Sequence, residues 1–385
     1  MNTVKTESQY SAIKLLPVLF SFFVMGFVDV VGISVSYVKQ DFALNDRTAN
    51  LLPMLVFLWF AVCSLPAGIL MRRIGRKKTV LVSAVITVAG MMIPLLDYSF
   101  LTALTAFALL GIGNTILQVS LNPLVTNVSR ADRLTGMLTL GQFIKAISSA
   151  SGPVAAGFAA ATLGNWKYIF PACAAVTACS FVWLLLTPIR EEQIAEAGNR
   201  QPILSLFRDK YLLTLFTAIL LGVGFEVGLL TAVPKYFQES YGLSLEKGGY
   251  ACTLYFIART AGTFGGAILL GRLPVRKFFT ASLVIGILGF PVFLLAGNAT
   301  ALYISLSIIG LACANIFAII FSTALQYKKE YADGISAMMI IGVSGGALIP
   351  PLMGILADAT TQRASLVIPL CALAYILYCS TRIKR

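Results

Sequence analysis

Long apolar runs follow one another along nearly the whole chain, and each is long enough to cross a bilayer as a helix, which takes about 20 residues. With 58% hydrophobic and only 12% charged residues, the chain lacks the polar surface that a soluble protein of this length needs. The predicted fold class is therefore an all-α membrane protein with twelve transmembrane helices. The predicted spans lie at roughly residues 15–38, 50–71, 79–96, 99–124, 135–162, 168–188, 211–234, 248–271, 278–297, 299–327, 335–357 and 364–381.

A polar stretch near the middle of the chain divides these spans six and six. The segments around Asp29 ("MGFVDV") and Glu226 ("VGFEVG") echo each other, which indicates an internal duplication of the kind found in secondary transporters. We therefore expect two pseudo-symmetric six-helix bundles, 1–188 and 211–385, joined by a cytoplasmic linker at 189–210.

The net charge of +13 comes from basic residues that gather in short loops on the side holding both termini. The positive-inside rule places that side in the cytoplasm, so we expect a multi-pass protein of the plasma membrane, here a bacterial inner membrane. Its basic loops would meet lipid headgroups, and no nucleic acid partner is expected. Acidic linker residues such as Glu191 suit a surface helix, and no transport role is expected for them.

All seven cysteines fall within predicted spans, where they indicate small buried residues and no disulfide framework. No cofactor and no metal ion are expected, and the chain is expected to act as a monomer. The partners that we expect are a small-molecule substrate, protons and membrane lipids.

Four charged side chains stand alone inside apolar runs: Asp29, Lys145, Glu226 and Arg259. Each such charge costs about 2.5–3.5 kcal/mol at the centre of a membrane helix on insertion scales. Ionisable groups at this depth more often mark a substrate or proton path than a purely structural contact. Because the chain has no histidine, a proton carrier has to be a carboxylate or a lysine. Asp29 and Glu226 are therefore the proton-coupling candidates.

Two neighbouring spans carry polar side chains along one helical face. Asn114, Gln118 and Asn122 are spaced by four, and Gln142 and Lys145 by three. Amides both donate and accept hydrogen bonds, which suits the hydroxyls of a sugar. Bonding to neighbouring helices explains the same pattern equally well. These five residues are candidates for substrate binding.

The segment "PAGILMRRIGRKK", residues 66–78, resembles the signature loop of the major facilitator superfamily, in which basic residues surround a glycine. It departs from that signature at Arg72, where an acid usually stands. In the superfamily this loop also latches one access state. The resemblance therefore makes Arg72, Arg73 and Arg76 candidates for gating.

Further motifs resemble those of the fucose, galactose and glucose proton-symporter family. They are "SLNPLVTNV" (120–128), "LTLGQFIKA" (138–146), "ANIFAIIFSTAL" (314–325) and "GGALIPPLMGILAD" (345–358). The resemblance implies a major facilitator fold and proton-coupled sugar import, and adds Asn315 to the substrate-binding candidates. The chain departs from the family at Gln118, where a coupling acid usually stands, and at Lys145, where the family has a neutral amide. Asp29 is then the best candidate for proton coupling.

Two mechanisms stay open for Asp29 and Lys145. They form an ion pair that protonation or substrate breaks, or Lys145 binds an anionic group such as the carboxylate of an acidic sugar. A fixed structural ion pair is a third interpretation. Glu226 and Arg259 are expected to form a second pair, in which the permanently charged guanidinium suits a structural or gating role.

We therefore expect a secondary active transporter that imports a monosaccharide or acidic sugar together with protons by alternating access. A drug or metabolite exporter, a proton antiporter of the same fold, is the alternative. An enzyme is disfavoured because the chain has no histidine and no phosphate-cradling loop. The sequence leaves the substrate, the coupling ion, the direction of transport and the resting access state open.

Overall fold

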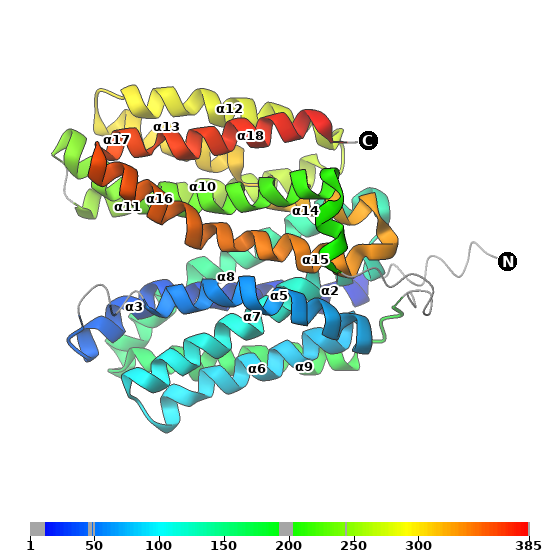
Figure 1. Ribbon diagram of the computed structural model, residues 1–385. Helices are drawn as coiled ribbons and strands as arrows, with labels where there is room; N and C mark the ends of the chain where they lie inside the picture. The colour runs from blue at the N-terminus through cyan, green and yellow to red at the C-terminus, as the bar shows by residue number, and fades with distance from the viewer. Residues whose placement is uncertain (1–11, 45–47, 49–50, 192–202, 243–244, 384–385) are drawn as a thin grey trace. The chain divides into compact units, whose positions relative to one another are not determined.

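The computed structural model describes residues 12–44, 48, 51–191, 203–242 and 245–383. Each of the twelve predicted spans is helical, and no strand occurs among the residues described (Figure 1). The predicted fold class is confirmed.

The helices of the first half are α2 (Ala12–Met25), η1 (Gly26–Asp29), α3 (Val30–Asp41), α5 (Leu51–Ile74), α6 (Arg76–Leu96), α7 (Phe100–Val128), η2 (Ala131–Arg133), α8 (Leu134–Leu163), η3 (Trp166–Tyr168) and α9 (Ile169–Leu186). Those of the second half are η4 (Ile203–Arg208), α10 (Lys210–Tyr241), α11 (Leu245–Leu269), α12 (Val275–Leu295), α13 (Ala299–Cys313), α14 (Ile316–Tyr327), η5 (Lys329–Tyr331), α15 (Ala332–Ile341), η6 (Gly342–Ser344), α16 (Gly345–Ala359), α17 (Gln362–Ser365) and α18 (Val367–Arg382).

Ten of the helical stretches described are long and apolar enough to cross a membrane. They match ten of the predicted spans. The other two are the first and the eighth. In the first, the 3-10 helix η1 divides the crossing into α2 and α3, and the eighth is α11, which includes the charged Arg259.

The chain forms two compact units, and each takes in a short segment from the other half of the sequence. Unit 1 comprises Met1–Leu134, Gly141–Ile203 and Lys328–Ile341. Unit 2 comprises Thr135–Leu140, Leu204–Tyr327 and Gly342–Arg385. Unit 1 therefore contains α15, and unit 2 contains the beginning of α8. Within unit 2 the hydroxyls of Thr135 and Ser322 lie 2.9 Å apart.

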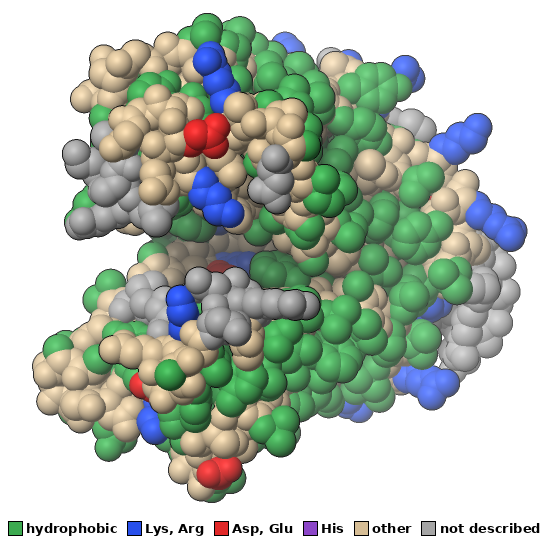
Figure 2. All heavy atoms as spheres, turned by 60° about the vertical axis from the view of Figure 1, so that its left-hand side comes forward, with side chains coloured by type: hydrophobic (Ala, Val, Ile, Leu, Met, Phe, Trp, Pro, Cys, Tyr) green, Lys and Arg blue, Asp and Glu red, His purple; other side chains and the backbone are tan. Residues whose placement is uncertain are grey.

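The helix α5 is apolar on both its inner and its outer face, as a bilayer helix should be. Its inner residues Val56 and Phe60 are 1% and 2% exposed, whereas Leu58 and Val62, one turn apart on the other face, are 45% and 50% exposed. Figure 2 shows the same feature over a wider surface, where hydrophobic side chains form broad areas and charged side chains are scattered singly. Exposing apolar areas of this size to water is unfavourable, so such a surface suits contact with lipid.

Polar side chains cap the starts of some helices, and glycines stand at the ends of others. Ser99 accepts a bond from Thr102 N at the start of α7, and Asp209 accepts bonds from the second and third residues of α10. Gly164 and Gly242, with φ of 68° and 62°, end α8 and α10 in the left-handed conformation that glycine adopts most easily.

The carboxylate of Asp41, the last residue of α3, joins three segments of unit 1. Asp41 Oδ2 accepts hydrogen bonds from Tyr98 Oη at 2.6 Å and Trp166 Nε1 at 2.9 Å. Lys167 Nζ lies 3.8 Å from the centre of the Tyr98 ring. Burial, and then the bond to Asp41, raise the pKa of Tyr98, so this phenol stays a neutral donor. The contact anchors the second part of the broken first crossing.

We predict that Gly345→Ala lowers the free energy of unfolding by about 1–3 kcal/mol, because a Cβ at this first residue of α16 would overlap the Leu220 carbonyl oxygen of α10. The thermal unfolding midpoint in detergent measures the effect. Gly354→Ala is the matched control in the same helix, since no atom lies within 4 Å of a Cβ there. Equal midpoints for the two variants would contradict the close packing of α16 on α10.

Candidate functional site

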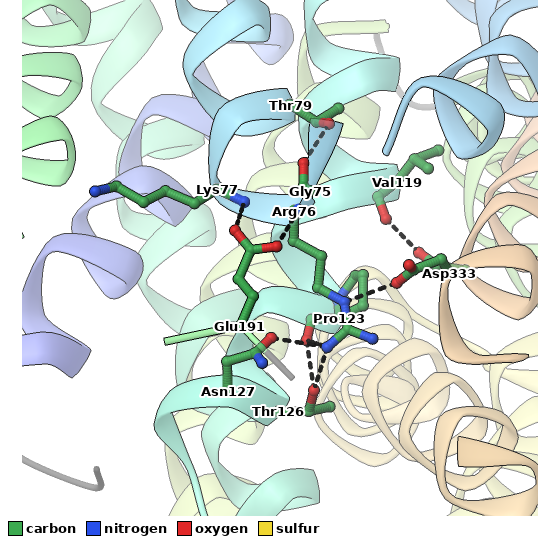
Figure 3. A network of polar contacts seen from close by, with 11 residues as sticks. Gly75, Arg76, Lys77, Thr79, Val119, Pro123, Thr126, Asn127, Glu191 and Asp333 are labelled. Atoms are coloured by element: carbon green, nitrogen blue, oxygen red, sulfur yellow. Dashed lines mark hydrogen bonds and ion pairs between the residues drawn. The ribbon is translucent and has the colours of Figure 1, made fainter. Parts of the chain in front are cut away.

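A network of buried polar contacts lies in unit 1 where α6 begins (Figure 3). Arg76, the first residue of α6, is only 7% exposed. Its Nη1 donates to Asn127 Oδ1 at 2.7 Å and to Thr126 Oγ1 at 3.0 Å, and both acceptors belong to the end of α7. Its Nε donates to Asp333 Oδ1 at 2.7 Å. A buried guanidinium is tolerated here because several acceptors surround it.

Asp333 connects this network to a distant part of the sequence. It is 2% exposed and lies in the first turn of α15, where the helix dipole favours a carboxylate. It pairs with Arg76 from 257 residues away in the sequence. The ion pair therefore holds the beginning of the eleventh predicted span among helices of the first half.

A proline supplies the second attachment of α15. Pro123 lies inside α7 and has no N–H, so the carbonyl four residues earlier, that of Val119, loses its usual partner in the helix. Ser336 Oγ of α15 donates to this Val119 oxygen at 2.6 Å, and Ser336 is fully buried. The helix defect in α7 thus becomes a docking point for α15.

The three arginines predicted for gating have different surroundings. Arg76 is buried in the network just described, Arg72 is half-buried, and Arg73 is exposed. The structure therefore places Arg76 in contact with a segment from the other half of the sequence.

Asp29 is the last residue of η1, the break in the first crossing. Gly26, Phe27 and Val28 before it are buried, whereas Asp29 itself is exposed. Its Oδ2 accepts a short hydrogen bond from Ser149 Oγ of α8. Short 3-10 stretches inside a helix often mark functional hinges.

Lys145 lies one turn before Ser149 on α8 and is half-buried. The helices approach closely here, since a Cβ at Gly26 would lie 2.6 Å from the Lys145 carbonyl oxygen. The described ion pairs do not join Asp29 to Lys145. Gln142, a further turn earlier, is also half-buried.

The predicted amide face of α7 forms a continuous ladder in the interior of unit 1. Asn114 Nδ2 donates to the Met25 carbonyl, the last of α2, at 2.8 Å, and Gln118 Nε2 donates to Asn114 Oδ1 at 2.7 Å. Asn122 Nδ2 donates to the Gln118 carbonyl at 2.7 Å, while its Oδ1 has no hydrogen-bond partner among the described residues. The ladder supports the broken first crossing at Met25, the last residue of α2 before η1.

Unit 2 holds the other predicted residues. Glu226 of α10 and Arg259 of α11 form the expected ion pair, with Nε 2.6 Å from Oε1 and side chains 23% and 26% exposed. Asn315, in the turn between α13 and α14, donates from Nδ2 to the Gly262 carbonyl of α11 at 3.0 Å. It fits there because α11 has glycine at 266, where a Cβ would overlap the amide.

The Major Facilitator Superfamily model matches residues 18–350 of this chain. The chain belongs to the major facilitator superfamily. It is 25% identical over 377 residues to the "Glucose/galactose transporter" of Brucella abortus biovar 1 (strain 9-941), which covers 93% of this chain and 90% of the relative. It is also 25% identical over 387 residues to the "Putative glucose/galactose transporter" of Helicobacter pylori (strain ATCC 700392 / 26695), covering 93% of both.

A crystal structure of the E. coli fucose:proton symporter FucP has a similar fold, with a TM-score of 0.85 at 18% identity over 98% of this chain and 100% of that one. This likeness confirms the fold. As a member of the superfamily, the chain is a multi-pass membrane transporter and not an enzyme.

Several residues of the buried network around Arg76 could not be predicted from the sequence. Asn127, Asp333 and Ser336 belong to segments far apart in the chain, and a helical pattern does not say which segments meet. One signal was available, because Pro123 in an apolar span frees a carbonyl that needs a donor. The identity of that donor, Ser336, follows only from the packing of α15 on α7.

We predict that Asp333→Asn lowers the free energy of unfolding by about 3 kcal/mol, because it leaves the buried Arg76 charge without its counter-ion. The matched control is Asp132→Asn, which breaks an ion pair with Arg130 whose side chains are more than 60% exposed, against 8% and 3% for Arg76 and Asp333. The control should unfold at the wild-type midpoint, since exposed pairs contribute little. Similar midpoints for both variants would refute a stabilising role for the buried pair.

Proposed function

We propose that this transporter imports a sugar together with protons by alternating access. The relatives that are named glucose/galactose transporters support a sugar as the substrate, and the structural neighbour, a fucose:proton symporter, supports proton coupling. We further propose that the protein works as a monomer in a bacterial inner membrane, with both termini in the cytoplasm.

The observation that carries the proposal is the position of Asp29. A carboxylate at a break in a membrane crossing is costly to keep ionised unless donors or a cation stabilise it. Its described partner is the neutral hydroxyl of Ser149, and its pairing with Lys145, one of the mechanisms left open above, is not among the described ion pairs. Protonation of Asp29 would therefore break none of the described ion pairs, which suits the proposed role of proton carrier.

The helices α7 and α8 of unit 1 offer a substrate both amides and a cation. Asn122 Oδ1 is a buried acceptor without a described partner, and Gln142 and Lys145 lie half-buried along α8. The lysine ammonium, which lacks a described counter-ion, suits the carboxylate of an acidic sugar. We therefore propose that Lys145 selects sugar acids and that amide groups bind the hydroxyls.

Alternating access also requires contacts that form in one state and break in the other. We propose that Arg76, Asp333 and Ser336 act as such a latch and hold the cytoplasmic path closed when α15 rests on α7. A buried ion pair suits this role, because its attraction is largely offset by desolvation and the pair is then released at modest cost. Glu226 and Arg259 are proposed as a second proton-linked pair in unit 2.

Asp29→Asn is expected to abolish concentrative uptake in proteoliposomes that carry an inward proton gradient, because the amide cannot exchange a proton. Exchange of labelled for unlabelled sugar should persist, since this step needs no net proton movement. Asp97→Asn, which alters an exposed carboxylate at the end of α6, is the control and should transport normally. Wild-type uptake whose rate does not depend on the proton gradient would refute the symport proposal.

Lys145→Ala should weaken binding of a hexuronic acid about 10- to 100-fold, the scale of a lost charge-assisted bond, and leave binding of the neutral hexose within about threefold. Thermal stabilisation by each sugar measures this, because a ligand raises stability by mass action. Lys277→Ala removes an exposed lysine and serves as the control. Equal losses for the acidic and neutral sugars would show that Lys145 does not bind the carboxylate.

A further inference from the structure

The N-terminus of α6 is capped by a carboxylate from outside its own segment of the chain. Glu191, beyond the end of α9, accepts hydrogen bonds from Arg76 N at 2.6 Å and Lys77 N at 2.8 Å (Figure 3). The residue at the usual capping position, Gly75, has no side chain to offer. Its φ of 90° and the Glu191 Oε2 atom, 2.7 Å from where a Cβ would lie, both require glycine.

The contact is reciprocal. Lys77 Nζ donates to the carbonyls of Leu185 at 3.0 Å and Thr187 at 2.8 Å, at the end of α9. A carboxylate therefore satisfies free N–H groups at the start of α6, and an ammonium satisfies free carbonyls at the end of α9. Both charges have the sign that the helix dipoles favour.

Charge explains why a remote carboxylate is needed. The loop from Arg72 to Lys78 carries five basic residues and no acid, since Arg72 stands where the superfamily signature has an acid. Glu191 brings the missing negative charge to the first two N–H groups of α6 from 115 residues away. It does so from the linker between the two halves.

Arg76 connects this cap to the latch. Its main-chain N–H binds Glu191, and its side chain binds Asp333 and Asn127 (Figure 3). When Glu191 holds the main-chain N–H of Arg76, the Cα of Arg76 is held as well. The cap therefore limits the positions that the guanidinium can reach. Without the cap, the first turn of α6 loses its N-terminal bonds and frays.

We infer that Glu191 is a positioning residue of the latch: it holds the first turn of α6 so that Arg76 meets Asp333, and thereby lets the linker bias the access equilibrium. This inference rests on the proposed latch. It corrects the expectation that the acidic linker residues are surface charges only, as far as Glu191 is concerned.

The test measures how often α15 leaves unit 1. In a full-length background with the seven native cysteines replaced, Ala332→Cys places a thiol at the first residue of α15, which is 4% exposed. The rate of its alkylation by N-ethylmaleimide follows the fraction of open molecules when opening and closing are fast. Glu191→Gln is expected to raise this rate about five- to tenfold, the scale of a weakened charge-assisted hydrogen-bond pair.

Three further variants decide what the change means. Glu330→Gln removes an exposed carboxylate of the same charge from η5 and should alkylate at the background rate. Arg76→Ala should raise the rate at least as much as Glu191→Gln, and the double variant no further than Arg76→Ala alone, because Glu191 acts through Arg76. Glu191→Asp, which keeps the charge, should restore most of the protection, and Glu191→Ala replaces Glu191→Gln if the latter does not fold.

The possible outcomes distinguish the role of Glu191 from the proposed latch on which it rests. A raised rate in Arg76→Ala with a background rate in Glu191→Gln would overturn the role of Glu191 and leave the latch intact. An additive double variant would also overturn it, since Glu191 would then stabilise the protein independently of Arg76. Background rates in both single variants would remove the latch itself, while sugar uptake by the same preparations tests transport separately.

Discussion

Inside a bilayer no water replaces a lost hydrogen bond, so each irregularity of a membrane helix needs a partner from the protein. That constraint organises the polar contacts of this chain. The carbonyl of Met25, where α2 gives way to η1, is bound by Asn114, and the carbonyl that Pro123 frees is bound by Ser336. The helix breaks that permit movement are thus the places where neighbouring helices are attached.

The charges inside the apolar runs divide into two kinds once their partners are known. Glu226 and Arg259 form an ion pair with each other, as Arg76 does with Asp333 at the start of α6. Asp29 has a hydroxyl partner instead. A compensated pair changes its free energy little when a proton arrives elsewhere, whereas a carboxylate held by a neutral hydroxyl responds to protonation directly. By this criterion Asp29 suits the proposed role of proton carrier better than Glu226 does.

The spans, the fold class and the pairing of Glu226 with Arg259 were predictable from the sequence, because apolar length and the proximity of consecutive helices determine them. The contacts of Asp333 and Ser336 were not, since they join segments more than 200 residues apart. The surface helix expected for the acidic linker residues was wrong for Glu191, which lies outside a helix and accepts hydrogen bonds from Arg76 N and Lys77 N. A carboxylate among mixed charges in a polar linker has the pattern of a solvated helix, and the pattern does not reveal such a distant contact. The substrate roles of Asn114, Gln118, Asn122, Gln142 and Asn315 stay predictions.

The two attachments of α15 differ in a way that matters for movement. The bond from Ser336 to the Val119 carbonyl is neutral, and breaking it leaves a polar group that must find a new donor in the apolar span. The Arg76 pair lies at the start of α6, beside Glu191 and near the exposed Arg73 and Lys78 in the sequence, where released charges can regain water more easily. Separation of α15 should therefore begin at Asp333 and proceed toward Ser336. In that order the hydrogen bond between Ser336 and the Val119 carbonyl breaks last, when water from the opened end already reaches both groups.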